Sequence, residues 1–334
     1  MPRVSVIMPV WNAAATLRRA VESIVGQEFR DWELIAVDDG SEDESAAVLG
    51  RLAEQDRRIR VHSLPGHRGV VAAHELGLAE ASGGVIARMD ADDWSDPLRF
   101  LRQLEMLDGD PTLGVVSCRV RLADPLGEGM QRYVSWANGL ISSGEISCQR
   151  FIEAPVIHPS SMIRREWIEK VGGYRDAGWP EDYDLWLRLL EAGCPMAKVD
   201  EVLFEWQDGP GRLTRSHPDY AKDAVWRMKA HYLAGLPAVR ERGVALCGGG
   251  PIGRRLTGLL QQEEVAVRAV FEVDPAKIGR RVKGVEVLGS DDFGTRERDA
   301  VLLSAVGVGG GRDRVRALAA EADYREGEDF WCVC

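Results

Sequence analysis

The chain has 334 residues, 45% hydrophobic and 28% charged, with a formal net charge of −11. This length allows two domains with separate cores, and the acidic balance argues against a nucleic-acid-binding protein, which needs clustered Lys and Arg. No apolar stretch reaches the ~20 residues of a membrane span, and the first ten residues do not resemble a signal peptide.

Strands and helices are predicted to alternate along the first ninety residues. Short apolar runs rich in β-branched residues predict strands, and apolar residues at helical spacing predict helices between them. The expected strands are 4–8, 32–37, 59–63 and 85–89, and the expected helices are 16–25 and 69–81. This alternation predicts a parallel, doubly wound sheet whose ligand site lies at the carboxyl ends of the strands.

Three carboxylates follow the fourth predicted strand. The run VIARMDADD ends in Asp90, Asp92 and Asp93. Acids this close together repel each other unless a cation or a set of donors neutralises them. Mg²⁺ or Mn²⁺ bridging to phosphate oxygens fits that need. An acidic turn in solvent is the alternative for an isolated DxD motif.

The pattern is less regular after the acids. A helix is expected over 96–107, a strand over 114–122, irregular structure over 123–147 and a short strand over 161–163. Residues 181–191 form an evident amphipathic helix, with Asp182 and Trp186 on one face near its start. A strand at 201–206, a loop rich in Gly, Pro and Arg at 208–216 and a helix at 218–234 complete this part.

A second α/β unit is expected from about residue 240. A predicted strand over 243–247 leads into a turn with Gly248, Gly250 and Gly253, and Glu272 ends the strand that follows the next helix. This spacing and context meet the dinucleotide-binding fingerprint. A nucleotide or nucleotide-sugar site and a degenerate module used only for packing both remain open. The expected domains are 1–220 and 241–334, joined by a helical linker over 221–240.

Read together, six motifs resemble the family-2 inverting glycosyltransferases with the GT-A fold. They occur in the family's order, and they are VSVIMPVWN, VDDGS, the strand ending in DADD, HPSSMIRR, GGY and EDYDLWLRL. The resemblance implies an α/β nucleotide-diphospho-sugar transferase fold with a Rossmann-like mixed sheet. The following unit looks like the small Rossmann-like domain that precedes some sugar acetyltransferases and binds nucleotide-linked sugars.

The resemblance also implies roles for individual residues. In this reading, Asp90 and Asp92 form the metal pair for Mn²⁺ or Mg²⁺, with Asp92 the direct ligand and Asp90 nearer the ribose, and Asp182 is the catalytic base. The remaining donor-site residues hold the base and the diphosphate, and they are Pro9, Trp11, Asp38, Arg68 and Arg215. Asp39 is expected to begin a helix, and His217 to be a loop residue rather than a metal ligand.

The chemistry of an inverting transfer explains these residue types. A single displacement needs one carboxylate to take the proton of the attacking hydroxyl, and it needs a cation and Arg to neutralise the leaving diphosphate. Without the family context, Asp182 would be read as a helix-start acid. Trp186 is equally compatible with core packing and with an acceptor stacking surface, and His158 is given no chemistry.

Two histidines depart from the family pattern. His67 and His74 stand where many relatives carry Asn. The predicted fold does not depend on these positions, but the contacts to the nucleotide do and are left open.

The expected function is transfer of a sugar from a nucleotide-diphosphate donor, a UDP-sugar, to a hydroxyl acceptor. The acceptor is a saccharide or a lipid-linked saccharide of cell-surface polysaccharide or glycoconjugate synthesis. The alternatives are a non-catalytic nucleotide sensor acting through the Gly248 loop, and a nucleotidyltransferase, which would need a glycine-rich phosphate loop after the first strand. The six scattered cysteines indicate reduced thiols and a cytoplasmic protein, with peripheral membrane association allowed.

Overall fold

The structure, a computed structural model, describes residues 1–123, 127–207, 217–307 and 309–334. It divides into two compact units. The N-terminal unit comprises Met1–Ile146, Ala154–Ala177 and Glu181–Arg212, and the C-terminal unit comprises Ser147–Glu153, Gly178–Pro180 and Leu213–Cys334. The second unit therefore includes two short segments from the middle of the chain, which a boundary near residue 220 or 240 does not anticipate.

The predicted parallel strands form half of the N-terminal sheet. Strand β1 lies between β2 and β4 with all three parallel, and β3 extends the sheet beyond β2. The bounds are β1 (Val4–Val10), β2 (Trp32–Asp38), β3 (Ile59–Ser63) and β4 (Val85–Arg88). Because these strands are parallel, their carboxyl ends meet at one edge, where Val10 of β1 pairs with Asp38 of β2.

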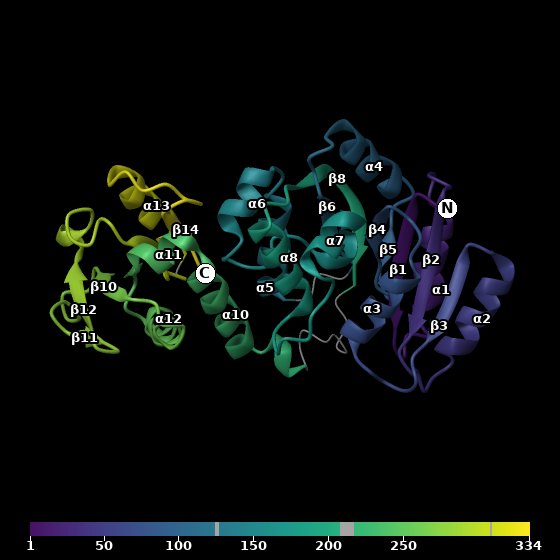
Figure 1. Ribbon diagram of the computed structural model, residues 1–334, viewed down its shortest axis with the longest axis horizontal. Helices are drawn as coiled ribbons and strands as arrows, with labels where there is room; N and C mark the ends of the chain where they lie inside the picture. Colours follow the sequence, from purple (N-terminus) through teal and green to yellow (C-terminus); the bar gives the residue numbers. More distant parts are fainter. Residues whose placement is uncertain (124–126, 208–216, 308) are drawn as a thin grey trace. The chain divides into compact units, whose positions relative to one another are not determined.

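Helices cover this parallel half, as the alternation predicts (Figure 1). They are α1 (Leu17–Val25), α2 (Ser45–Gln55) and α3 (Val70–Glu80). Helix α4 (Arg99–Gly109) packs instead on β6 (Val115–Leu122) and β8 (Met196–Trp206) of the other half. Helix α3 packs very closely on β1, because a Cβ atom on Gly77 would lie 2.5 Å from Ile7 Cγ2. The apolar faces of these elements form a fully buried core that includes Val6, Leu34 and Ile86.

The other half of the sheet is mixed. The order of the eight strands is β3-β2-β1-β4-β7-β6-β8-β5, and β7 is antiparallel to both of its neighbours. The bounds are β5 (Trp94–Ser95), β6 (Val115–Leu122), β7 (Met162–Arg164) and β8 (Met196–Trp206). The short helix η1 (His158–Ser160), α7 (Arg165–Val171) and α8 (Glu181–Glu191) belong to this half.

The expectation of irregular structure over 123–147 is wrong for the described part of that stretch. Helices α5 (Glu128–Asn138) and α6 (Ser143–Gln149) occupy it. Val134 and Ala137 of α5 are buried in the N-terminal core, so packing of one helix face stabilises a segment whose flanking glycines suggest a loop.

The C-terminal unit contains a second sheet with strand order β11-β12-β10-β9-β13-β14. All pairs are parallel except that of the short β11. The strands are β9 (Val244–Cys247), β10 (Val267–Glu272), β11 (Arg281–Val282), β12 (Val285–Gly289), β13 (Val301–Ser304) and β14 (Phe330–Cys332). With β9 at the centre and the chain order reversing between β9 and β13, this is a doubly wound topology.

The helices of this unit include the stretch expected as a linker. They are η2 (Pro218–Tyr220), α10 (Lys222–Gly235), α11 (Pro237–Arg242), α12 (Pro251–Gln262), η3 (Ser290–Asp292) and α13 (Gly311–Glu321). Among the residues described, no helix has the length and apolar character needed to cross a membrane.

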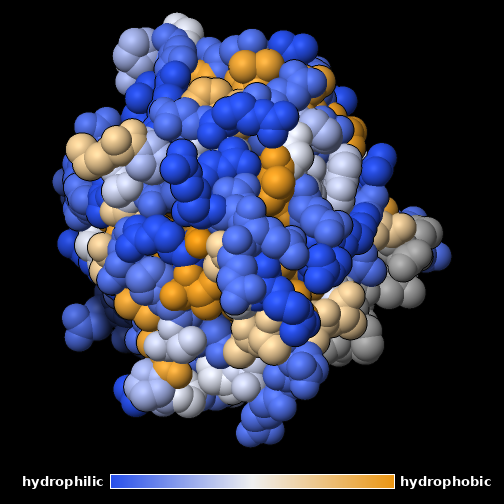
Figure 2. All heavy atoms as spheres, turned by 90° about the vertical axis from the view of Figure 1, so that its right-hand side faces the viewer, coloured by the Kyte–Doolittle hydropathy of each residue, from blue (hydrophilic) through white to orange (hydrophobic). Residues whose placement is uncertain are grey.

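The surface is mainly hydrophilic on the face shown in Figure 2, with hydrophobic residues in small separate patches. Trp11 is one of few large hydrophobic side chains exposed among the described residues, with 48% of its surface accessible. Isolated exposed apolar residues are ordinary, but an exposed tryptophan at the carboxyl end of β1 lies where a ligand would bind.

The close approach of α12 to the preceding turn gives a direct test of the C-terminal fold. A Cβ atom on Gly253 would lie 1.8 Å from the carbonyl oxygen of Gly248, whereas one on Gly258 in the same helix would meet only Lys283 at 3.5 Å. We expect Gly253→Ala to lower the free energy of unfolding by about 1–3 kcal/mol. The matched Gly258→Ala should be neutral or stabilising by up to about 1 kcal/mol.

Denaturant unfolding of the full chain, combined with hydrogen exchange at α12 and β9, measures both effects. Equal stability of the two variants would contradict the close packing described here.

Candidate active site

The three acids after β4 converge. One carboxylate oxygen from each of Asp90, Asp92 and Asp93 lies within 4.8 Å of the others. A tight turn brings them together, because the Asp93 amide donates to the carbonyl of Asp90 at 3.4 Å. Asp93 is buried, and the other two are partly exposed. Carboxylate oxygens are the donors that Mg²⁺ and Mn²⁺ prefer, so this donor set fits a divalent cation.

Two contacts fix this turn to the sheet. The guanidinium Nη2 of Arg88 donates to Asp90 Oδ1 at 2.8 Å, and the Gln207 amide donates to Asp93 Oδ1 at 2.7 Å. A second buried arginine supports the first, since Arg99 Nη2 donates to the Arg88 carbonyl at 2.8 Å. Burial lowers the pKa of Arg99 to about 10, so it stays charged at neutral pH.

The residues expected to hold the nucleotide base lie at the same edge of the sheet. Pro9 is in β1 beside Val37 of β2, and Asp38 is the last residue of β2. Asp38 is buried, and its Oδ1 accepts from the amide of Ser41 at 3.3 Å. Trp11 stacks on His67, with ring centroids 4.3 Å apart and planes 18° from parallel. The stack presents an aromatic surface beside two buried strand ends.

Asp39 has a role that the sequence reasoning missed. It was expected to start the helix that follows β2, but its carboxylate accepts from the amides of Arg68 and Gly69 at 2.6 and 2.9 Å. His67 Nδ1 lies 2.8 Å from the same group. Asp39 therefore fixes the segment before α3 to the end of β2. The contribution of Arg68 that the structure describes here is its backbone, and its side chain is exposed.

Asp182 lies in the first turn of α8. Glu181 and Asp184 in the same turn are buried, whereas Asp182 is partly exposed. The helix is fixed in place because Arg188 Nε bonds Asp184 Oδ2 at 2.7 Å, and its Nη1 bonds the Val171 carbonyl at 2.9 Å. Asp182 therefore stands on a helix whose position is fixed by its buried neighbours.

Trp186 is completely buried, so the reading as an acceptor stacking surface is wrong and core packing is correct. It packs edge-on against His158, with centroids 5.6 Å apart.

Two buried histidines lie directly behind the acids. His158 Nε2 is 2.7 Å from the Tyr174 hydroxyl and 3.3 Å from Arg88 Nε, and the His74 ring lies 5.2 Å from that of His158. Burial, followed by the positive charge of Arg88, holds the pKa of both histidines well below the usual value. Both are therefore neutral in the folded protein. This also explains why a histidine is accommodated at position 74 within α3.

The remaining predicted donor-site residues cannot be joined to this group. Arg215 lies outside the described residues. His217 belongs to the C-terminal unit, where its Nδ1 accepts from the Asp219 amide at 3.4 Å. It behaves there as a loop residue, as expected.

The glycine turn of the C-terminal unit has the geometry of its motif. Gly248 has a φ of +102°, and Gly253 lies directly over it. Glu272 ends β10 as expected, but its Oε2 accepts from the Gly249 amide at 3.0 Å and from Lys277 Nζ at 3.1 Å. Through these bonds Glu272 stabilises the glycine turn. A nucleotide site at Gly248, Gly250, Gly253 and Glu272 stays a prediction.

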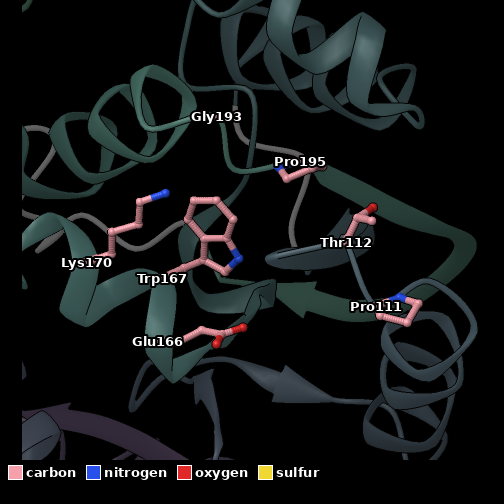
Figure 3. A pocket seen from close by; sticks show the side chains of 7 residues that line it. All are labelled: Pro111, Thr112, Glu166, Trp167, Lys170, Gly193 and Pro195. Carbon is pink, nitrogen blue, oxygen red and sulfur yellow. The ribbon is translucent and has the colours of Figure 1, made fainter.

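A hollow of about 470 Å³ lies elsewhere on the N-terminal unit (Figure 3), around the ring of Trp167 and residues preceding β6 and β8, including Thr112 and Pro195. Strands β4, β6 and β8 share one direction, because β7 is antiparallel to both β4 and β6 and β8 is parallel to β6. The hollow is thus at the edge where these strands begin, opposite the acids.

The N-terminal unit has the GT-A fold, as its likeness to two solved structures shows. Staphylococcus aureus TarS 1-349, in complex with UDP-GlcNAc, superposes with a TM-score of 0.58 over 70% of this chain and 67% of that one, at 15% identity. The mannosyltransferase PcManGT from Pyrobaculum calidifontis, in complex with GDP-Man and Mn²⁺, gives 0.52 over 70% and 62%, at 20% identity.

Sequence comparison identifies the family. Residues 5–172 match Glycosyl transferase family 2, and the chain belongs to this family. The O-antigen biosynthesis glycosyltransferase WbnJ of Escherichia coli is 32% identical over 202 residues, which are 60% of this chain and 76% of WbnJ. The family match includes the acids after β4 and ends before α8.

The buried histidines predict how stability depends on pH. Their pKa values in the folded protein lie below the ordinary 6.5, so below about pH 6.5 the unfolded chain binds more protons than the folded one. The free energy of unfolding should therefore fall as the pH drops from 7.5 to 5.5. His74→Leu removes one of these groups and should reduce that fall. At pH 7.5 it should cost about 1 kcal/mol, because it loses the bond from Nδ1 to the Val70 carbonyl at 3.0 Å, while Nε2 has no hydrogen-bond partner to lose.

Urea unfolding at several pH values measures the effect. The wild-type chain, unfolded at the same pH values, is the control. An identical pH dependence in His74→Leu and the wild type would show that the His74 ring does not titrate as described.

Proposed function

We propose that this protein is an inverting, divalent-metal-dependent glycosyltransferase that moves a sugar from a nucleoside diphosphate, UDP, to a hydroxyl acceptor. The observation that carries the proposal is the convergence of Asp90, Asp92 and Asp93 beside the carboxyl ends of β1 and β2. Acids at this edge of the sheet suit a donor whose diphosphate they would hold through a divalent cation.

The donor side is assigned as follows. Asp92, with Asp90 and Asp93 beside it, would hold Mn²⁺ or Mg²⁺, which supplies positive charge to the leaving diphosphate. Asp90 already has one oxygen bonded to Arg88, which favours a position for it at the ribose side. Asp38 and Trp11 would contact the base, and Arg68 and Arg215 would contribute charge to the diphosphate. The UDP-GlcNAc bound by TarS supports UDP as the nucleotide.

The acceptor side is assigned to Asp182. An inverting displacement forms the new glycosidic bond as the bond to the diphosphate breaks, and the acceptor hydroxyl loses its proton in the same event. Asp182 would accept that proton. Its partial exposure at the start of a rigid helix supports this role over that of its buried neighbours.

The acceptor is proposed to be a saccharide or lipid-linked saccharide in polysaccharide or glycoconjugate synthesis. The support is the relative WbnJ, an O-antigen biosynthesis glycosyltransferase. We place the reaction in the cytoplasm, with peripheral association at the inner face of the membrane where the acceptor is lipid-linked.

The metal assignment predicts the behaviour of Asp92→Ala. Removing this carboxylate should weaken Mn²⁺-dependent UDP binding by more than about 100-fold, because the remaining acids no longer complete the site. Calorimetry with UDP, in Mn²⁺ and in EDTA, measures the loss. The control Asp291→Ala changes an exposed acid of the C-terminal unit and should bind as the wild type does. Wild-type affinity in Asp92→Ala would reject the assignment.

The base assignment predicts a separation of binding from turnover. Asp182→Asn should bind Mn²⁺-UDP within about twofold of the wild type, while UDP release from a UDP-sugar should fall about 10²–10⁴-fold. Asp176→Asn, at an exposed acid shortly before α8, is the matched control and should keep full turnover. Undiminished turnover in Asp182→Asn would move the base elsewhere.

A further inference from the structure

We propose that Arg88 is a positioning residue that sets the carboxylate of Asp90 and joins it to the helix that begins with Asp182. The inference rests on the proposed function and adds to it a residue that touches neither donor nor acceptor. Arg88 is 1% exposed at the end of β4, two residues before Asp90.

The guanidinium of Arg88 is a buried positive charge. A buried guanidinium is stable only when its donors are bonded and its charge is balanced. Arg88 Nη1 donates to the carbonyls of Ile7 and Met89 at 2.6 and 3.3 Å, and Nη2 bonds Asp90 Oδ1 at 2.8 Å. The Arg88–Asp90 ion pair therefore has one fixed geometry, because the bond to the Ile7 carbonyl fixes the guanidinium to the backbone of β1. Rotation of the Asp90 carboxylate would leave a charge buried without its counterion.

His158 accepts a hydrogen bond from Arg88. Arginine is only a donor, so the bond from Arg88 Nε requires that His158 Nε2 carries no proton. The lowered pKa of His158 agrees with this neutral state. Tyr174 donates its hydroxyl to the same nitrogen at 2.7 Å, and the Tyr174 amide is bonded to Glu75 Oε1 at 2.7 Å. Tyr174 and Arg88 therefore share the lone pair of one ring nitrogen, and the tyrosine fixes the orientation of the imidazole against Arg88.

His158 also contacts a residue of α8. His158 packs edge-on against Trp186, which is four residues after Asp182 and therefore on the same face of the helix. Trp186 is itself completely buried, so this contact joins His158 to the body of α8. A continuous set of contacts leads from Asp90 through Arg88 and His158 to the helix that carries the proposed base.

The test compares Arg88 with an arginine that forms an exposed ion pair. Arg88→Lys keeps the charge but loses the planar set of donors. We expect about 10–100-fold weaker Mn²⁺-dependent UDP binding by calorimetry, with binding in EDTA unchanged. Arg119→Met removes a partly exposed arginine of β6 that pairs with Asp200 and should bind as the wild type does. The double variant Arg88→Lys with Asp90→Asn should be no weaker than the weaker single variant, because both act on one pair.

The outcomes separate this inference from the proposed function. Wild-type affinity in Arg88→Lys, with loss in Asp90→Asn, overturns the inference alone. Wild-type affinity in both Asp90→Asn and Asp92→Ala overturns the metal site itself. If Arg88 variants fail to fold, Tyr174→Phe decides the matter. It removes one hydroxyl and should weaken Mn²⁺-dependent binding about fivefold, as expected for one lost hydrogen bond, and an unchanged affinity overturns the proposal.

Discussion

The mutual repulsion of three carboxylates at the end of one strand is the constraint on which this structure depends. Asp90, Asp92 and Asp93 are held within 4.8 Å by a short turn, and such an arrangement is unfavourable unless positive charge lies close by. The protein supplies part of that charge from within the sheet, through Arg88. In the proposed function a divalent cation adds further positive charge here, and through that cation a cluster of acids can hold a diphosphate.

The supporting groups explain why the region behind the acids is polar yet buried. Arg88 and Arg99 are both charged and both inaccessible to solvent, and neutral His158 lies against the first of them. An apolar core at this place would be easier to stabilise, since buried ion pairs seldom exceed hydrophobic packing in net stability. What the polar groups provide instead is a defined direction for the carboxylate of Asp90.

The sequence predicts the parallel half of the sheet well. Strands 4–8, 32–37 and 85–89 are short apolar runs, and the segments between them carry apolar residues at the spacing typical of helices. It fails over 128–138, where glycines on both sides of α5 suggested a loop although Met130, Tyr133, Val134 and Ala137 follow helical spacing. The fifth strand in the sheet order, β7, is antiparallel to its neighbours, and nothing local in its three residues specifies that direction.

Prediction of the site was limited in a similar way. Motifs predict Asp90, Asp92 and Asp182 as site residues, and these stay predictions. No motif indicates the contacts that join Arg88, His158 and Tyr174. A charged residue in the apolar strand before Asp90 was a visible signal, but its partner His158 is 70 residues away. Asp39 was assigned to the wrong helix because its bonds reach 29 and 30 residues ahead. Contacts of this range depend on how α3 and β2 pack together.

The clamp formed by Asp39 has a consequence for how such an enzyme can change its nucleotide. The backbone before α3 is fixed by two bonds to Asp39, and Gly40 allows it to approach so closely that a Cβ there would lie 2.4 Å from Gly66. The ring of His67 extends from this fixed backbone to Trp11. In the proposed function, exchange of that single side chain would therefore alter the surface offered to the nucleotide base while the bonds to Asp39 keep the backbone in place, so that the nucleotide preference could change at little structural cost.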